Sequence, residues 1–142
     1  MTMAESDQII KEVKSVLHKL TEYSSYAQLD PFLNLYHNSP SFLHFSGDGK
    51  MRNYDEFKRV CSEYYTALAQ QKIVTISEKV YVIEANIVIT GWTGNINAQF
   101  KNGDTINMSN YSVSNVLKKV NGSWKIIQSH ESSLPPEIIR KG

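Results

Sequence analysis

Residues 105–133 read TINMSNYSVSNVLKKVNGSWKIIQSHESS, two alternating runs that are joined by Asn121-Gly122. An Asn-Gly pair between such runs predicts a two-residue β-hairpin turn, because both turn positions require a positive φ. A turn of this length also sets the register, so residues equally distant from it lie opposite each other. One face of the hairpin is therefore expected to pair Tyr111 with Ser132, Val113 with His130, Asn115 with Gln128, and Leu117 with Ile126.

The predicted inner face of this hairpin is mostly apolar, but His130, Gln128 and Asn115 lie in its middle. An apolar wall with a few convergent polar groups is typical of a small-molecule pocket. A second turn, Asn102-Gly103, predicts that the preceding strand pairs with this hairpin, which places Trp92 beside Val113 and His130 in one row. Gly91 and Gly94 are positions at which a bulge would change the residues that face the pocket.

The remaining chain predicts three helices followed by long strands. Asp30 is expected to cap the second helix, with Pro31 at its first position. Asn53 and Glu56 predict a capping box at the start of the third helix. The order indicates an α+β fold, in which three N-terminal helices pack on a curved antiparallel sheet. The predicted ranges are helices over 6–23, 30–36 and 53–68, and strands over 41–46, 72–84 and 86–100.

Composition narrows the class of protein. The 142 residues suit one domain, and no linker divides residues 1–142. A formal net charge of +1 provides no strong field for nucleic acid or an anionic membrane. No apolar run has the length of a membrane span, and the first residues lack the pattern of a signal peptide. Cys61 is the single cysteine, so no internal disulfide can form and a cytoplasmic location is expected.

Four segments carry a resemblance to a known family: DPFLNLY at 30–36, SFLHF at 41–45, YDEF at 54–57, and GSWKIIQSHES at 122–132. In this order they resemble the SnoaL-like members of the nuclear transport factor 2-like superfamily, over residues 6–133. The resemblance implies a cone-shaped fold with an apolar cavity between the helices and the concave sheet face. It also implies a homodimer that forms through the sheet. It does not select a reaction, because the superfamily includes both enzymes and association modules.

His130 is the principal catalytic candidate, together with Tyr111. An unperturbed pKa near 6.5 suits a histidine to acid-base chemistry at neutral pH. The alternative is a buried histidine whose hydrogen bonds are satisfied by Gln128, Asn115 or a serine. Tyr111 and Trp92 could lie against a flat apolar or aromatic ligand. Further ligand contacts are expected from Val113, Asn115 and Gln128 on the sheet, and from Tyr36, His44 and Tyr64 on the opposite side.

The opposite face of the hairpin is small and mixed, which suits packing against a second copy of the chain. It is predicted to carry Glu131, and Asp30 is assigned to a helix cap. No carboxylate partner for a histidine is therefore identified in the pocket. The four histidines show no spacing typical of a metal site, and Cys61 is expected to be inert packing. The predicted outer face comprises Ser112, Ser114, Val116, Ile127, Ser129 and Glu131.

Two functions remain open from the sequence. The first is a protein that binds a small, apolar ligand and carries out acid-base chemistry of the isomerase, cyclase or dehydratase type without a cofactor. The second is a non-catalytic, dimeric association or regulatory module, in which side chains fill the cavity. A hollow cavity favours the first hypothesis and a filled one favours the second.

Overall fold

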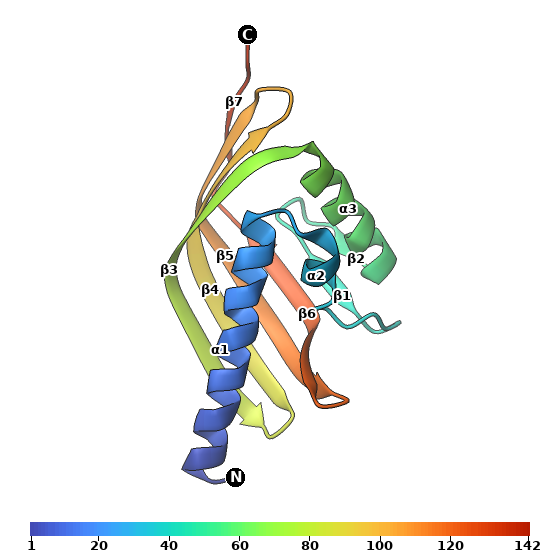
Figure 1. Ribbon diagram of the computed structural model, residues 1–142, viewed down its shortest axis with the longest axis vertical. Helices are drawn as coiled ribbons and strands as arrows, with labels where there is room; N and C mark the ends of the chain where they lie inside the picture. Colours follow the sequence, from blue (N-terminus) through green and yellow to red (C-terminus); the bar gives the residue numbers. More distant parts are fainter.

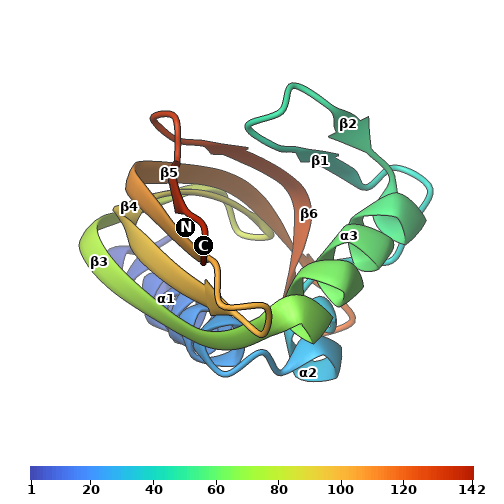
Figure 2. The same ribbon diagram turned by 90° about the horizontal axis from the view of Figure 1, so that it is seen from above.

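Three helices cover the concave side of a strongly curved sheet in the computed structural model, which describes residues 1–142. Helix α1 lies along the sheet, and α2 and α3 follow at one end (Figure 1). Seen from above, the sheet forms an open arc, and α2 and α3 lie beside the opening between β3 and β6 (Figure 2). The predicted α+β class is confirmed. The elements are α1 Met3–Ser25, α2 Leu29–Leu33, β1 Leu43–Phe45, β2 Met51–Arg52, α3 Tyr54–Ala67, β3 Leu68–Glu84, β4 Ile87–Phe100, β5 Thr105–Val120, β6 Ser123–Ser132 and β7 Glu137–Ile139.

The strands are arranged in the order β2-β1-β6-β5-β4-β3, and β7 pairs with the start of β5. All neighbouring pairs are antiparallel except β1 and β6, so the sheet is mixed rather than wholly antiparallel. The parallel pair aligns His44 with Ser129 and joins segments far apart in the sequence. The strands β2 and β7 were not predicted, because both are too short to show an alternating pattern. No helix combines the length and the apolarity that a membrane crossing requires.

The helix termini agree with the sequence pattern in part. Asn53 and Glu56 form the predicted capping box at α3, and Thr2 and Glu5 form a second one at α1. The prediction that Asp30 caps α2 was wrong. Gln28 is the N-cap and makes no side-chain hydrogen bond, and Asp30 lies inside the first turn. There its carboxylate is close to the positive end of the helix dipole, which also favours an acidic residue.

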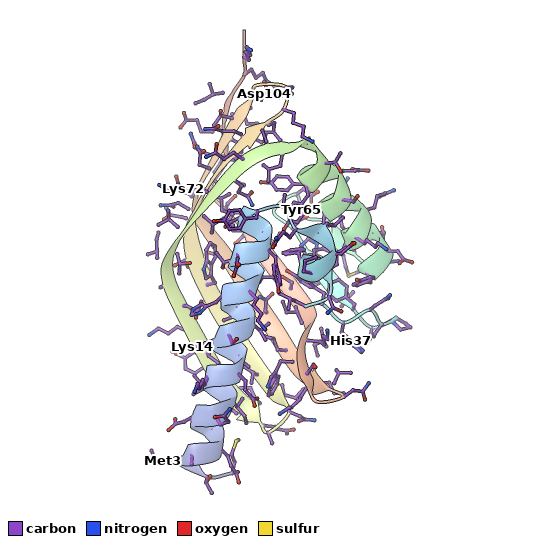
Figure 3. All side chains as sticks on the ribbon, in the orientation of Figure 1. Met3, Lys14, His37, Tyr65, Lys72 and Asp104 are labelled. Atoms are coloured by element: carbon purple, nitrogen blue, oxygen red, sulfur yellow. The ribbon has the colours of Figure 1, made fainter.

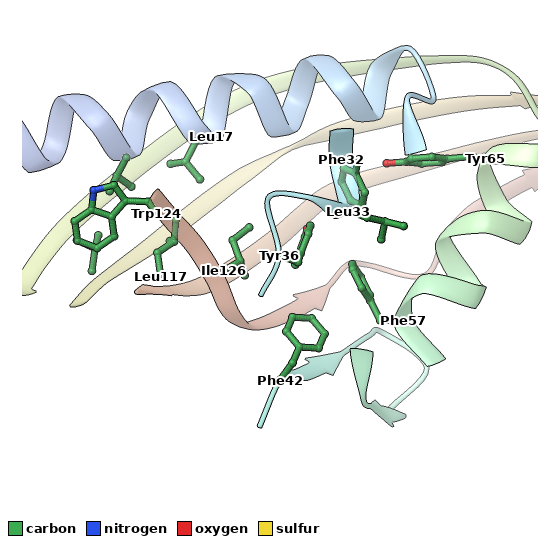
Figure 4. Close-up of a cluster of buried hydrophobic side chains, with 12 residues drawn as sticks. Leu17, Phe32, Leu33, Tyr36, Phe42, Phe57, Tyr65, Leu117, Trp124 and Ile126 are labelled. Carbon is green, nitrogen blue, oxygen red and sulfur yellow. The ribbon is translucent and has the colours of Figure 1, made fainter. Parts of the chain in front are cut away.

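The hydrophobic core lies between the helices and the sheet (Figure 4). Leu17 projects from α1 toward the sheet, where Leu117 and Ile126 are fully buried. Trp124 also belongs to this core. Its Nε1 donates a hydrogen bond to Glu12 Oε2 at 2.8 Å. The aromatic rings of Phe32, Tyr36, Phe42, Phe57 and Tyr65 form the part of the core that lies nearer α2 and α3.

The hairpin register is the main departure from prediction. Asn121 and Gly122 adopt the expected positive φ angles of 50° and 82°, and Leu117 pairs with Ile126 as predicted. Beyond this pair, β6 contains one extra residue, Ile127, which forms a β-bulge. Every later residue of β6 therefore changes face. The observed pairs are Val116 with Gln128, Asn115 with Ser129, Ser114 with His130, and Val113 with Glu131.

The β4–β5 pairing agrees with prediction at its centre, where Trp92 lies opposite Val113 and Gly94 opposite Tyr111. Neither glycine is the residue that shifts the register there. The extra residue is on β5 near Asn110, whose φ is 52° and whose N–H donates to Asn95 Oδ1 at 3.1 Å. Gly94 is instead required for close packing, because a Cβ at this position would lie 2.5 Å from the Trp92 ring.

Because of the bulge, we expect the same substitution to affect the free energy of unfolding very differently at two neighbouring positions. Ser129 is 0% exposed, whereas Gln128 is exposed on the outer face. Ser129→Asp should therefore lower the free energy of unfolding by about 3 kcal/mol or more, because it buries an unpaired charge. Gln128→Asp should lower it by about 1 kcal/mol or less. Urea denaturation of both variants measures the difference, and the reverse ranking would support the register without the bulge.

Candidate functional site

A cavity of about 430 Å³ lies between the concave face of the sheet and the three helices. Side chains from both layers line it. Figure 3 shows one of them, Tyr65, beside the C-terminal end of α1. Most of the lining is apolar, with Leu17, Phe32 and Ile96 among its members. A volume of this size is within the range of small-molecule sites. The polar and charged side chains in the lining are those of Thr21, Ser24, His44, Ser46, Asp48, Arg52, Gln71, Asn115 and Glu131.

The structure brings most of the predicted pocket residues to this cavity, but not all of them. His130 and Gln128, which lie on β6, do not line it. For the predicted residues that do line the cavity, contact with a ligand remains a prediction. The predicted residues in the lining are Tyr36, His44, Tyr64, Trp92, Tyr111, Val113 and Asn115.

The assignment of His130 to the pocket was wrong. The bulge at Ile127 turns His130 to the outer face, where it is exposed. Its ring packs against Phe45, with 5.4 Å between the ring centroids. The same bulge corrects the predicted outer face, because Ser129 and Glu131 point toward the helices instead.

Glu131 takes the place that the sequence analysis gave to His130. It lies in one row with Val113 and Trp92, and it lines the cavity. His44 Nε2 lies 3.2 Å from Glu131 Oε2, within hydrogen-bond distance. The cavity thus contains a carboxylate that pairs with a histidine. This carboxylate was not predicted from the sequence. The available signal was the pair Ile126-Ile127, because two adjacent apolar residues interrupt the alternation and indicate a bulge.

The two partners differ in their access to the cavity. The side chain of His44 is 4% exposed and that of Glu131 is 25% exposed. The His44 ring packs against Phe57 at a centroid distance of 4.6 Å, and its Nδ1 is buried without a hydrogen-bond partner. His44 is therefore held in place by packing and by Glu131. Glu131 is the partner with more surface open to the cavity.

Tyr36, Tyr64 and Tyr111 line the same cavity as this pair. Burial, followed by the negative charge of Glu131, raises the pKa of Tyr111 and of Tyr36 well above the ordinary value. The same two causes raise the pKa of Tyr64 to about 12. These groups therefore remain protonated at neutral pH and can donate hydrogen bonds. Tyr64 already donates to Gln71 Oε1, and Gln71 Nε2 donates to the Ser24 carbonyl oxygen at 2.9 Å.

The hairpin of β1 and β2 adds an ion pair to the lining. Arg52 is the register partner of His44, and its Nη2 lies 2.9 Å from Asp48 Oδ2. Hydrogen bonds from Ser46 and then from Arg52 hold the pKa of the Asp48 carboxyl below its usual range. Because Arg52 and Asp48 neutralise each other, Glu131 and its partner His44 determine the charge of this end of the cavity.

The structure also describes the surroundings of Trp92 and of Cys61, which the sequence singled out. Trp92 Nε1 donates to Thr75 Oγ1 at 2.9 Å, so its ring rather than its N–H is available to the cavity. Burial raises the pKa of the Cys61 thiol to about 12, which agrees with the expectation of an inert cysteine. No group of three or more His, Cys, Asp or Glu side chains is arranged to hold a metal ion.

The fold is similar to several solved structures. A candidate scytalone dehydratase from Novosphingobium aromaticivorans DSM 12444 superposes with a TM-score of 0.83 at 6% identity, over 99% of this chain and 94% of that chain. Hexachlorocyclohexane dehydrochlorinase LinA-type3 from Novosphingobium barchaimii LL02 gives 0.78 at 6% identity, over 97% and 94%. A nuclear transport factor 2-like superfamily protein from Salmonella enterica serovar Typhimurium LT2 gives 0.77 at 16% identity, over 92% and 94%.

These identities are low, so the likeness establishes the fold alone. No curated protein sequence matches the chain. The model of the SnoaL-like domain family matches residues 13–136, which is most of the chain. The nuclear transport factor 2-like fold and the family match agree, and the chain belongs to the SnoaL-like domain family.

Proposed function

We propose that this protein binds a small, neutral, largely apolar molecule in its cavity and transfers a proton at one of its carbon atoms. The observation that carries the proposal is the Glu131–His44 pair, which lies in a cavity with an otherwise mostly apolar lining. A carboxylate in such surroundings is a suitable general base, because few water molecules compete for it. The sequence hypothesis of acid-base chemistry is thus retained, with Glu131 in place of His130.

Glu131 is the proton acceptor in this proposal and His44 is the positioning residue. His44 Nε2 contacts Glu131 Oε2, and Glu131 Oε1 is the oxygen that accepts the proton of the substrate in this proposal. A C–H bond of the substrate breaks, the proton forms an O–H bond with Glu131, and the electron pair remains on the substrate. Return of the proton to another carbon gives an isomerisation, and departure of a leaving group gives an elimination. Tyr111, whose hydroxyl stays protonated, is available to donate a hydrogen bond to Glu131 or to the substrate.

The structural neighbours support this choice without deciding it. The names of two of them describe a dehydratase and a dehydrochlorinase, and both terms denote elimination reactions. The alternative function, an association module, would be favoured by a cavity filled with side chains. A volume of about 430 Å³ supports the ligand-binding proposal instead.

Proton transfer can be followed with 1-tetralone, a neutral fused-ring ketone that has acidic C–H bonds beside its carbonyl group. In D₂O, the wild-type protein should accelerate the loss of these proton signals in NMR spectra above the buffer rate. Glu131→Gln should reduce the acceleration by about 100-fold or more, because it removes the base while keeping the shape of the side chain.

His130→Ala is the matched control, because His130 is the neighbouring titratable residue on β6 and lies on the outer face. It should leave the exchange rate unchanged. Exchange that depends on His130, or wild-type exchange no faster than that of Glu131→Gln, would contradict the proposal.

We also propose that the outer face of the sheet forms a homodimer, as the family resemblance implies. Tyr81, Ile89 and Val116 form one row across β3, β4 and β5. Tyr81 is 58% exposed and Ile89 is 39% exposed, so the row presents apolar surface to solvent. A self-complementary face of this kind suits a two-fold dimer.

Light scattering at micromolar concentration should therefore give the mass of a dimer for the wild type. Ile89→Arg should give monomers or aggregates, because it places an unpaired charge in the interface. Leu134→Arg is the control, since Leu134 is 55% exposed and lies outside the strands. A wild-type protein that is monomeric under these conditions would refute the dimer.

A further inference from the structure

A β-bulge in β3 places Thr75 on the inner face of the sheet. Ser77 pairs with Thr93 on β4, and their hydroxyl oxygens lie 2.6 Å apart on the outer face. Ile76 is the extra residue of the bulge, so Thr75 pairs with Gly94. A regular strand would place the side chains at 75 and 77 on one face. The bulge separates them instead, because an extra residue re-aims the side chains beside it.

Trp92 lies two residues before Gly94 on β4, and its indole ring extends over that glycine. A Cβ on Gly94 would lie 2.5 Å from Cη2 and from Cζ2 of Trp92, which is closer than two carbon atoms can pack. The ring therefore occupies the space that a side chain at this position would fill. The same ring lines the cavity.

Two side chains hold the ring from the neighbouring strands. Thr75 Oγ1 accepts a hydrogen bond from Trp92 Nε1 at 2.9 Å. On the β5 side, Tyr111 pairs with Gly94 and contacts the indole edge to face, with 6.5 Å between the ring centroids and 68° between the ring planes. The indole edge that carries Nε1, Cζ2 and Cη2 thus lies against the sheet, and the rest of the ring is available to the cavity.

We propose that Trp92, oriented by Thr75, is a fixed flat wall of the cavity that selects planar rings over puckered rings of the same size. Trp92 is the residue that contacts the ligand. Thr75 does not line the cavity and is a positioning residue. This inference rests on the proposed function, because it concerns the same ligand in the same cavity. It narrows the substrate class to molecules with an aromatic or conjugated ring.

The selection depends on the ring being fixed. A planar ligand places every atom of one face against the indole, whereas a puckered ring touches it with only some of its atoms. Binding to a mobile side chain also costs the entropy of ordering it. The hydrogen bond to Thr75 orders Trp92 before the ligand binds. Loss of this hydrogen bond should therefore reduce the advantage of a planar ligand.

The wall lies within reach of the proposed base. Trp92 and Glu131 belong to one row, with Val113 between them. Neighbouring strands are about 4.8 Å apart, so two strand spacings separate these residues by about 10 Å. Both side chains line the cavity. A single small molecule can therefore contact Trp92 and present a C–H bond to Glu131.

The experiment compares 1-naphthol with decahydro-1-naphthol, which has the same carbon skeleton and hydroxyl group but puckered rings. Isothermal titration calorimetry gives both dissociation constants for the wild type and for Thr75→Val, which keeps the shape of the side chain and removes the acceptor of the Trp92 N–H. For the wild type, the decahydro-1-naphthol constant should exceed the 1-naphthol constant about tenfold, and Thr75→Val should reduce this ratio to about threefold or less.

Thr93→Val is the matched control. It also removes one cross-strand hydrogen bond of a threonine hydroxyl from the β3–β4 pair, but on the outer face. Its ratio should stay within about twofold of the wild-type ratio. A wild-type ratio near one would overturn the selection by Trp92. An equal fall of the ratio in both variants, or no fall in Thr75→Val, would overturn the role of Thr75.

The indole N–H signals in NMR spectra of nitrogen-15-labelled protein give a second readout, which needs no Thr75→Val protein if that variant does not fold. The chain has two tryptophans, and Trp124 does not line the cavity. The spectrum of Trp92→Phe assigns the two signals. The ring current of bound 1-naphthol should shift the Trp92 signal more than the Trp124 signal, and decahydro-1-naphthol should shift the Trp92 signal less.

Equal shifts of the two indole signals would overturn the contact between Trp92 and the ligand, while binding itself would leave the proposed function in place. Failure of both compounds to bind the wild type would overturn the proposed function, and the role of Trp92 with it.

Discussion

One extra residue in β6 determines what the cavity can do. Because side chains alternate between the faces of a strand, the bulge at Ile127 exchanges the inner and outer sets of every residue after it. Ser129 and Glu131 turn inward, and Gln128 and His130 turn outward. A regular strand would place a neutral amide and an imidazole in the cavity. The bulged strand provides a carboxylate, which contacts a histidine from the non-adjacent segment β1.

The position of His44 follows from the same bulge. The strand β1 pairs in parallel with β6, and the pairs His44–Ser129 and Phe45–His130 set the faces of both strands together. His44 therefore shares a face with Ser129 and reaches Glu131, whereas Phe45 packs against His130 outside. Hydrogen bonds to charged groups contribute about 1.5–3 kcal/mol, which partly offsets the removal of the Glu131 carboxylate from water. The access of Glu131 to the cavity limits the remaining desolvation.

Local patterns in the sequence predict much of this fold. The capping box of Asn53, the positive φ angles of Asn121 and Gly122, and the pairing of Leu117 with Ile126 all depend on residues close to one another in the chain. The bulge is different, because its energy depends on how Ser129 fits against β1 and β5. The β1–β6 pairing likewise joins distant segments. The residues of the cavity wall were therefore predicted on β4 and β5, whereas those on β6 were missed because the local signal of Ile126-Ile127 does not by itself set the register.

The cavity and the unpaired polar atoms are best explained together. Empty volume removes dispersion contacts from the residues that line it, and a buried polar atom without a partner destabilises the fold by about 1–3 kcal/mol. Here the cavity of about 430 Å³ lies against Asn115 and His44, which both have an unpaired atom. An association module would use the outer face of the sheet and would gain nothing from either feature. Under the proposed function, a small molecule that fills this volume would stabilise the fold by binding to it.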